Sequence, residues 1–210
     1  MQYIFIHGLG QSSSSWDKTI SSLSQPNHIV SLDLWAMLNG KEITYANLYR
    51  SFVEYCEGIQ EKLNLCGISL GAIIALNYAI EHPDRVQSIA LIAAQHTMPK
   101  GLLKFQNVLF RLMPGSSFAR MGMQKKDVIS LTNSMIELDF SMKLKTVSCS
   151  ALIVCGGKDN ANKKAATDLV QGIPNAEIDL LENIGHKVNT EAPEKLAAIL
   201  NVFWQNESDY

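Results

Sequence analysis

Short apolar runs alternate with longer amphipathic stretches along almost the entire chain. The runs are rich in aliphatic and β-branched residues and are bounded by Gly, Pro, Asn or Asp, which is typical of short buried strands. We therefore predict six strands, at residues 3–6, 28–32, 63–66, 86–92, 151–155 and 177–181. Helical patterns lie between most of them, at residues 45–62, 72–80, 163–171 and 193–205.

The alternation of strand and helix determines the expected fold class. Consecutive strands that are joined by helices run parallel, and their crossovers are right-handed. We therefore predict an α/β protein with an open, mostly parallel six-stranded sheet and helices on both faces. In such sheets ligands bind at the carboxyl ends of the strands, so the residues that follow each strand are the first candidates for chemistry.

One interval lacks strand patterns and predicts an insertion after the fourth strand. Residues 95–142 contain two helical stretches, 102–112 and 126–140, separated by a Pro-Gly-Ser-Ser sequence. We expect this interval to form a small helical lid on a core made of residues 1–94 and 143–210. Six of the eight methionines lie in it: Met98, Met113, Met121, Met123, Met135 and Met142. They either fill the contact between lid and core or form a deformable apolar ceiling over a substrate.

Composition and charge narrow the possible partners. The chain has 210 residues, of which 47% are hydrophobic and 18% charged, which suits one globular domain with a substantial core. A net charge of -2 and the absence of basic runs give no reason to expect nucleic acid or an anionic membrane as a partner. No stretch reaches the roughly 18 continuous apolar residues of a membrane span, and the N-terminus has no signal-peptide pattern. We therefore expect a cytoplasmic protein.

The four cysteines do not indicate a redox or metal site. Cys56, Cys66, Cys149 and Cys155 show neither C-x-x-C spacing nor a neighbouring histidine arrangement that would hold zinc. Cys66 and Cys155 fall in predicted buried strands, where free cysteine behaves as a small hydrophobic residue. We expect inert thiols and no metal.

The sequence Gly67-Ile68-Ser69-Leu70-Gly71 lies between a predicted strand and a predicted helix. A G-x-S-x-G sequence in this context is typical of a nucleophile elbow. The chain reverses so sharply at the serine that glycines are needed two positions to either side. Ser69 would then project its hydroxyl above the sheet, near the N–H groups and positive potential of the helix N-terminus.

Three further strand ends carry residues of catalytic type. His7-Gly8-Leu9-Gly10 follows the first strand, Asp159 closes a Gly-Gly-Lys-Asp sequence after the fifth, and His186 follows the sixth. Together with Ser69 they supply a nucleophile, a carboxylate and an imidazole. They are too far apart in sequence for local contact, so only the fold could bring them together.

With the order serine, aspartate, histidine and the glycine-flanked serine, the chain resembles the α/β-hydrolase superfamily over nearly its whole length. It is similar to the serine-nucleophile esterases and lipases with a short helical lid. His7-Gly8 followed by Trp16 resembles the family's oxyanion segment. Residues 81–86 resemble its link into the next strand, and residues 151–159 its acid-bearing segment.

Two features depart from the family pattern. Many members carry a Gly-His-Gly turn after the position of Asp33, whereas this chain reads Leu-Trp-Ala-Met-Leu-Asn-Gly at residues 34–40, which changes that wall of the site. The chain also starts at what would be an inner strand of the family sheet, so the resemblance implies a trimmed version of the fold.

The resemblance implies a role for each candidate residue. His186 would take the proton of Ser69 as the hydroxyl attacks a carbonyl carbon, and Asp159 would hold the imidazole in the right tautomer. The backbone N–H groups of Leu9 and Leu70 would form the oxyanion hole. This chemistry uses a small acyl substrate and requires neither a metal nor an organic cofactor.

Other histidines and aspartates compete for these roles. We expect His7 to order the oxyanion turn, and Asp33 to fix a turn or helix start because it precedes Ser69 in the chain. His28 opens a strand and His82 precedes a proline at a helix end. His96 follows a strand and is the second choice for the base.

Three classes of function fit the pattern. The first is hydrolysis of small or medium carboxylic esters or thioesters. The second is another reaction of the same three groups, such as C–C cleavage, elimination or acyl transfer. The third is ligand binding or signalling with slow turnover. The sequence carries no signal for the acyl chain, the leaving group or the oligomeric state.

Overall fold

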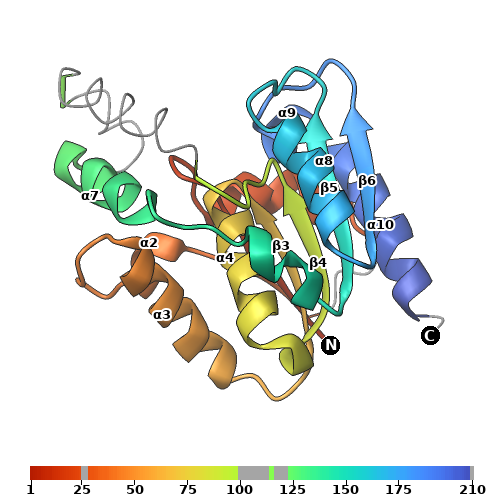
Figure 1. Ribbon diagram of the computed structural model, residues 1–210, viewed down its shortest axis with the longest axis horizontal. Helices are drawn as coiled ribbons and strands as arrows, with labels where there is room; N and C mark the ends of the chain where they lie inside the picture. The colour runs from red at the N-terminus through yellow and green to blue at the C-terminus, as the bar shows by residue number, and fades with distance from the viewer. Residues whose placement is uncertain (25–27, 99–113, 116–122, 209–210) are drawn as a thin grey trace.

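The computed structural model describes residues 1–24, 28–98, 114–115 and 123–208, with side chains up to residue 205. One sheet contains six strands: β1 (Gln2–Ile6), β2 (Ile29–Leu32), β3 (Leu63–Ile68), β4 (Val86–Ile92), β5 (Ser150–Gly156) and β6 (Ala176–Leu181). They lie in the order β2-β1-β3-β4-β5-β6, and every pairing is parallel (Figure 1). The predicted α/β class and six-stranded sheet are confirmed.

Helices cover both faces of this sheet (Figure 1). One layer contains α3 (Tyr45–Glu57), α4 (Leu70–Glu81) and α8 (Lys163–Gly172), and the other contains α1 (Asp17–Ser21) and α10 (Pro193–Ser208). Shorter elements are α2 (Leu34–Met37), α7 (Lys125–Met135), α9 (Val188–Glu191) and the 3₁₀ turns η1 (Ser13–Trp16), η2 (Pro83–Arg85) and η3 (Ser141–Thr146). The pattern did not predict α2, α9 or the 3₁₀ turns, because such short pieces do not show a helical period.

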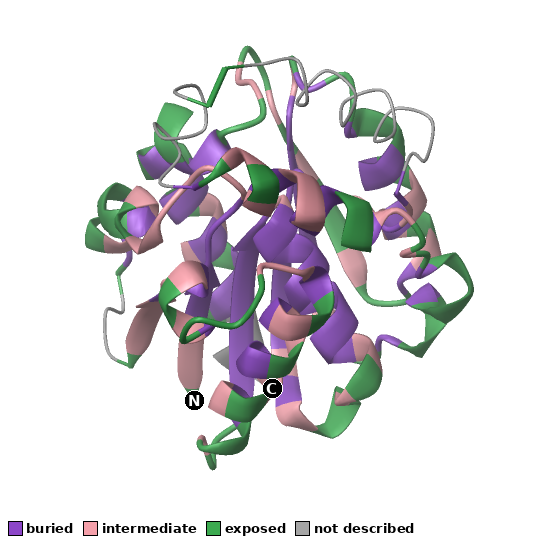
Figure 2. Cartoon of the chain, turned by 90° about the vertical axis from the view of Figure 1, so that its left-hand side faces the viewer, coloured by how far each residue is buried: buried purple, intermediate pink, exposed green. Residues whose placement is uncertain are grey.

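Alternate strand residues face the two helical layers. In β1, Ile4 and Ile6 belong to the core on the side of α3, α4 and α8, whereas Phe5 belongs to the core beside α1 and α10. Trp16 anchors the second core: it is fully buried, and its ring packs edge-on against Phe5 at 5.1 Å between centroids. Figure 2 shows buried residues concentrated in the sheet and on the inner sides of the helices. Strands covered on both faces read as continuous apolar runs.

The helix predicted at residues 45–62 ends earlier, at Glu57. Gly58 follows as its C-cap, and the Arg85 guanidinium donates hydrogen bonds to the carbonyl oxygens of Cys56 and Ile59. A cation is favourable at the carbonyl end of a helix. The capping partner comes from a distant part of the sequence, so the periodicity alone overestimated this helix.

The helix predicted at residues 126–140 also ends early, at Met135. The chain beyond it pairs with the segment after β4: Thr97 forms an antiparallel bridge with Asp139, and Met98 N–H donates to the carbonyl oxygen of Leu138 at 3.1 Å. This backbone pairing competes with continued helix. The other predicted helix of the insertion, 102–112, lies outside the described residues.

The methionines of the insertion have different surroundings. Met98, Met123 and Met135 are buried, whereas Met142 is 81% exposed. Met113 and Met121 lie outside the described residues. The buried three support the interpretation of methionine as filling between the insertion and the core. Among the helices that the structure describes, none combines the length and hydrophobicity needed to cross a membrane.

Candidate active site

The backbone at Ser69 has a strained conformation. Ser69 directly follows β3 and precedes α4, with φ 53° and ψ −112°. A positive φ is unfavourable for any residue except glycine, and it persists only where the surroundings impose it. Here the Ser69 N–H donates to the carbonyl oxygen of Ile92 at 2.9 Å, which ties the turn to the end of β4.

The two glycines around this serine are sterically required. A Cβ atom at Gly67 would overlap the carbonyl group of Gly71. A Cβ atom at Gly71 would overlap the carbonyl group of Ile6, at the end of β1. The first turn of α4 therefore packs directly on the strand ends, and only glycine fits at these two positions.

The segment after β1 is organised around His7, which is fully buried. Its Nε2 accepts a hydrogen bond from Leu34 N–H at 3.1 Å, so its Nδ1 carries the proton and donates to the carbonyl oxygen of Gly8 at 2.9 Å. Burial lowers the pKa of His7, which favours this neutral form. The Gly8 carbonyl also accepts from Gln11 N–H at 3.2 Å.

These contacts orient the next peptide group. The peptide between Gly8 and Leu9 is trans, so its N–H points opposite to its C=O. Because His7 and Gln11 hold the carbonyl, the Leu9 N–H is directed away from the buried imidazole. The expectation that His7 orders this turn therefore agrees with its contacts.

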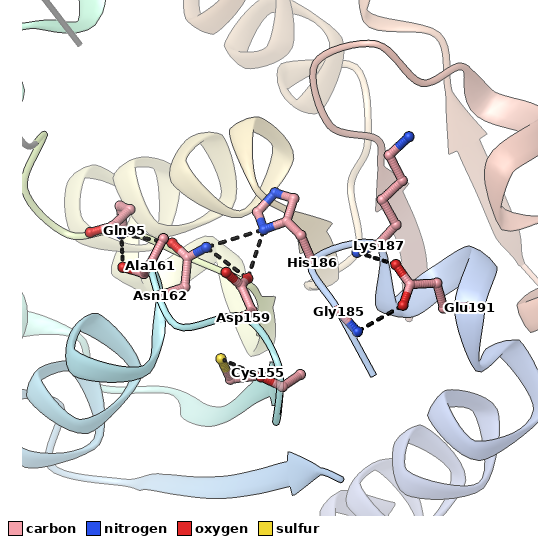
Figure 3. Close-up of polar contacts among 10 residues, drawn as sticks. Gln95, Cys155, Asp159, Ala161, Asn162, Gly185, His186, Lys187 and Glu191 are labelled. Carbon is pink, nitrogen blue, oxygen red and sulfur yellow. Dashed lines mark hydrogen bonds and ion pairs between the residues drawn. The ribbon is translucent and has the colours of Figure 1, made fainter. Parts of the chain in front are cut away.

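The predicted acid and base contact each other directly. Asp159 follows β5 in a turn closed by a hydrogen bond from its N–H to the Gly156 carbonyl, and His186 follows β6. His186 Nδ1 lies 2.7 Å from Asp159 Oδ2 (Figure 3). The Asp159 side chain is buried, whereas 44% of the His186 side chain is exposed. The carboxylate thus holds one nitrogen of the imidazole, and Nε2 is left for the opposite side of the ring.

A small, partly open pocket lies between the turn at Ser69, the segment after β1 and the histidine loop. Its lining includes Leu9, Ser69, His186 and Lys187. Three of the predicted site residues therefore meet at one pocket, Asp159 supports His186, and Leu70 begins α4 directly after the serine.

The residues that compete with these have other surroundings. Asp33 caps α2 by accepting hydrogen bonds from the N–H groups of Trp35 and Ala36. His82 is the C-cap of α4, and its ring stacks on Tyr78. His96 is buried after β4, and no hydrogen bond joins it to Asp159.

Two amides beside the acid were not predicted. Asn162 Nδ2 donates to Asp159 Oδ2 at 2.7 Å, and Gln95 Nε2 donates to Asn162 Oδ1 at 2.7 Å (Figure 3). Gln95 follows β4, so the rule that residues after strands matter could have identified it. Asn162 lies three residues after Asp159 and fits no motif.

Residues of α9 connect the histidine loop to the rest of the site and were also missed. The Glu191 carboxylate accepts hydrogen bonds from the backbone N–H groups of Gly185 at 2.7 Å and Lys187 at 3.3 Å, on both sides of the histidine (Figure 3). Buried Asn189 exchanges two side-chain hydrogen bonds with Gln11, at 3.0 and 3.3 Å. The segment after β1 and the histidine loop are thereby joined.

The described residues offer little for metal or thiol chemistry. No group of three His, Cys, Asp or Glu side chains within them could hold a metal ion. All four cysteines are buried, and none of them is in a disulfide. Burial raises the pKa of Cys155 to about 11 and that of Cys56 to about 12, which disfavours the reactive thiolate.

Comparison with known proteins identifies relatives of this architecture. Residues 4–142 match the sequence profile described as the alpha/beta hydrolase fold. The pimeloyl-[acyl-carrier protein] methyl ester esterase of Nitrosomonas europaea is 28% identical over 91 residues, which cover 43% of this chain and only 36% of that protein. The (E)-2-((N-methylformamido)methylene)succinate hydrolase of Acinetobacter baylyi is 21% identical, with 92% of this chain and 86% of that protein covered.

Solved structures agree at the level of the fold. A hydrolase from Pseudomonas aeruginosa superposes with a TM-score of 0.84 at 15% identity, covering 97% of this chain and 89% of that one. A thermophilic esterase from Thermogutta terrifontis gives a TM-score of 0.79 at 16% identity, covering 99% and 90%.

Proposed function

Because this chain belongs to the α/β hydrolase fold family, we propose that it is a serine hydrolase that cleaves a small or medium carboxylic ester or thioester. The observation that carries this proposal is the shared pocket. Ser69, with its positive φ, lines this pocket together with His186, and Asp159 lies 2.7 Å from Nδ1 of that histidine. Strained backbone and paired titratable side chains are typical of functional sites, and here Ser69, Asp159 and His186 combine both features.

The first step is attack by the serine. A serine hydroxyl is a poor nucleophile at neutral pH, so it needs a base at the moment of attack. Because Asp159 engages Nδ1 of His186, Nε2 takes the proton of Ser69. The oxygen then attacks the carbonyl carbon of the substrate. The buried carboxylate stabilises the imidazolium that forms.

The second element is stabilisation of the oxyanion. The Leu9 N–H, oriented by the contacts of the Gly8 carbonyl, and the Leu70 N–H, at the first position of α4, are the donors we assign. The first N–H groups of a helix have no intrahelical partner and form the positive end of its dipole. Each such donor stabilises the transition state by about 3 kcal/mol.

The third element is release of the products. His186 returns its proton to the leaving alcohol or thiol, which departs and leaves the acyl group on Ser69. A water molecule deprotonated by the same imidazole then attacks the acyl carbon. The bond between that carbon and the Ser69 oxygen breaks, the oxygen takes the proton back from His186, and the free acid is released. The names of relatives support an ester as substrate, since one is an esterase for the methyl ester of an acyl chain.

A fluorophosphonate probe followed by peptide mass spectrometry tests the proposal. We expect a covalent adduct on Ser69 and none on the Ser69→Ala variant. That variant should lose about 10⁶-fold in kcat on p-nitrophenyl esters and keep its fold. Ser14→Ala, at an exposed position after β1, is the control and should label like the wild type. Ester turnover that survives in Ser69→Ala would exclude the mechanism.

Product analysis separates hydrolysis from the other reactions of the same residues. With an added alcohol or amine, a hydrolase still forms mainly the free acid, whereas an acyltransferase forms mainly the transfer product. Labelling of Ser69 without turnover of any ester would instead favour slow ligand binding.

A further inference from the structure

We propose that Asn162 and Gln95 are positioning residues that fix the orientation of the Asp159 carboxylate relative to the His186 imidazole. This inference rests on the roles proposed above for Asp159 and His186. Oδ2 of Asp159 receives two donors at the same distance, His186 Nδ1 and Asn162 Nδ2, each at 2.7 Å (Figure 3). The carboxylate is therefore held from two sides, and its position relative to the imidazole depends on the amide.

The orientation of both amides follows from a backbone carbonyl. The carbonyl oxygen of Ala161 can only accept, and Gln95 Nε2 lies 3.1 Å from it, so Gln95 presents its NH₂ group to this region. The same NH₂ lies 2.7 Å from Asn162 Oδ1. Asn162 Oδ1 is therefore the acceptor of this pair, and its NH₂ must face Asp159.

The wrong orientation would disturb the imidazole. Asn162 Nδ2 lies 3.1 Å from His186 Nδ1. If the Asn162 amide were reversed, its oxygen would lie against the carboxylate of Asp159 and would compete with it for the Nδ1 proton. Gln95 disfavours that arrangement. The chain of contacts Gln95, Asn162, Asp159, His186 thus fixes which atom the imidazole meets.

The position of Asn162 in the chain supports a role in the site. It is the N-cap residue of α8, where an asparagine side chain usually accepts a hydrogen bond from the first turn of its own helix. Here the side chain makes no such bond. Instead it points to the acid, and both Asn162 and Asp159 are more than nine-tenths buried. Hydrogen bonds in such surroundings are stronger than in water.

Substitutions at Gln95 distinguish positioning from packing. Gln95→Glu keeps the shape but cannot donate, so Asn162 must turn its NH₂ toward the new carboxylate and its oxygen toward the acid–base pair. Gln95→Ala removes more atoms and leaves Asn162 free to keep its present orientation. We expect kcat to fall about 100-fold in Gln95→Glu and less than about 10-fold in Gln95→Ala. A purely structural role predicts the reverse order.

Asn162→Ala should lower kcat about 10-fold and leave KM close to that of the wild type, because the side chain does not line the pocket. Asn160→Ala is the matched control, since Asn160 is an exposed residue of the same loop. Equal kcat values for the Asn160 and Asn162 variants would contradict the proposal.

The decisive measurement is the low-field proton NMR signal of the hydrogen bond between His186 and Asp159. We expect this signal to shift in Asn162→Ala and to weaken strongly in Gln95→Glu, while Asn160→Ala leaves it unchanged. The readout does not need turnover. If the wild type failed to label with the fluorophosphonate, the proposed function would be wrong, and the signal would still test the positioning. An unchanged signal in Gln95→Glu overturns the inference whether or not Ser69 is labelled.

Discussion

The two sides of the candidate site are built in different ways. On the nucleophile side, the conformation of Ser69 is imposed by backbone contacts, because Gly67 and Gly71 lie where no side chain fits. On the acid–base side, Asp159 and His186 are placed by side-chain hydrogen bonds from residues such as Asn162. Steric overlap tolerates almost no substitution, whereas a hydrogen bond can be weakened in steps.

The difference determines how each side should fail. Damage to the nucleophile side changes how α4 packs on the sheet, so stability and activity should fall together. Damage to the acid–base side changes the orientation of a partly exposed ring, so activity should fall while the fold is retained. Four variants test this contrast.

Gly71→Ala should have the largest effect. The added Cβ meets the backbone of Ile6 and cannot be relieved by a side-chain rotation. We expect a loss of about 3 kcal/mol or more in the free energy of unfolding, which lowers Tm by about 10 °C. Thermal unfolding measures this directly. Gly58→Ala is the control: its Cβ would lie 3.4 Å from the nearest atom, and its φ is −72°. A wild-type Tm for Gly71→Ala would show that α4 can move away from the end of β1 at little cost.

Asp159→Asn should abolish most of the activity on the acid–base side while the protein stays folded. The neutral amide cannot stabilise the imidazolium and can present its NH₂ to Nδ1 of His186, which imposes the wrong tautomer. We expect a loss of about 10⁴-fold in kcat with Tm nearly unchanged, measured on p-nitrophenyl esters and by thermal unfolding. If Tm collapsed while the folded fraction kept its activity, Asp159 would be structural.

The same contrast explains what the sequence could predict. Steric constraints leave a visible trace, because glycines at 67 and 71 around Ser69 between a strand and a helix are an unusual combination. The sheet was predictable for a related reason, since strands that are buried on both faces read as apolar runs. The serine, aspartate and histidine could be named because each follows a strand of that sheet.

Hydrogen-bonding partners leave no such trace. Gln95, Asn162 and Glu191 are common surface residue types at positions with no periodicity. Gln95 bonds Asn162 from a distant part of the sequence, whereas Asn162 and Glu191 bond nearby residues of their own loops, where no motif marks them. The early end of α3 also involves a distant partner, since Arg85 bonds the carbonyl groups of Cys56 and Ile59 there. Local patterns do not contain these long-range contacts.

Glu191→Gln should have a moderate effect on the acid–base side. The carboxylate accepts from the N–H groups of Gly185 and Lys187, which flank His186, and the amide can replace only one of these bonds. We expect kcat to fall about tenfold with KM and Tm close to wild type. Glu194→Gln, exposed on α10, is the control. Equal rates in the two variants would mean that the loop holds its shape without Glu191.

His7 should give the smallest effect, visible as a pH dependence of stability. Burial lowers the pKa of His7 below its ordinary value of 6.5, so between pH 6.5 and the lowered value the unfolded chain binds more protons than the folded one. The free energy of unfolding therefore falls on acidification through this range, by at most about 1.4 kcal/mol per pH unit. Above pH 7 His7 is neutral in both the folded and the unfolded chain, and this loss of stability is absent. His7→Gln cannot be protonated and should lose this slope in urea unfolding measured from pH 7.5 to 5.5. Identical slopes would mean that the imidazole accepts a proton inside the fold. Nδ1 would then still donate to the Gly8 carbonyl, but Nε2 could no longer accept from Leu34 N–H.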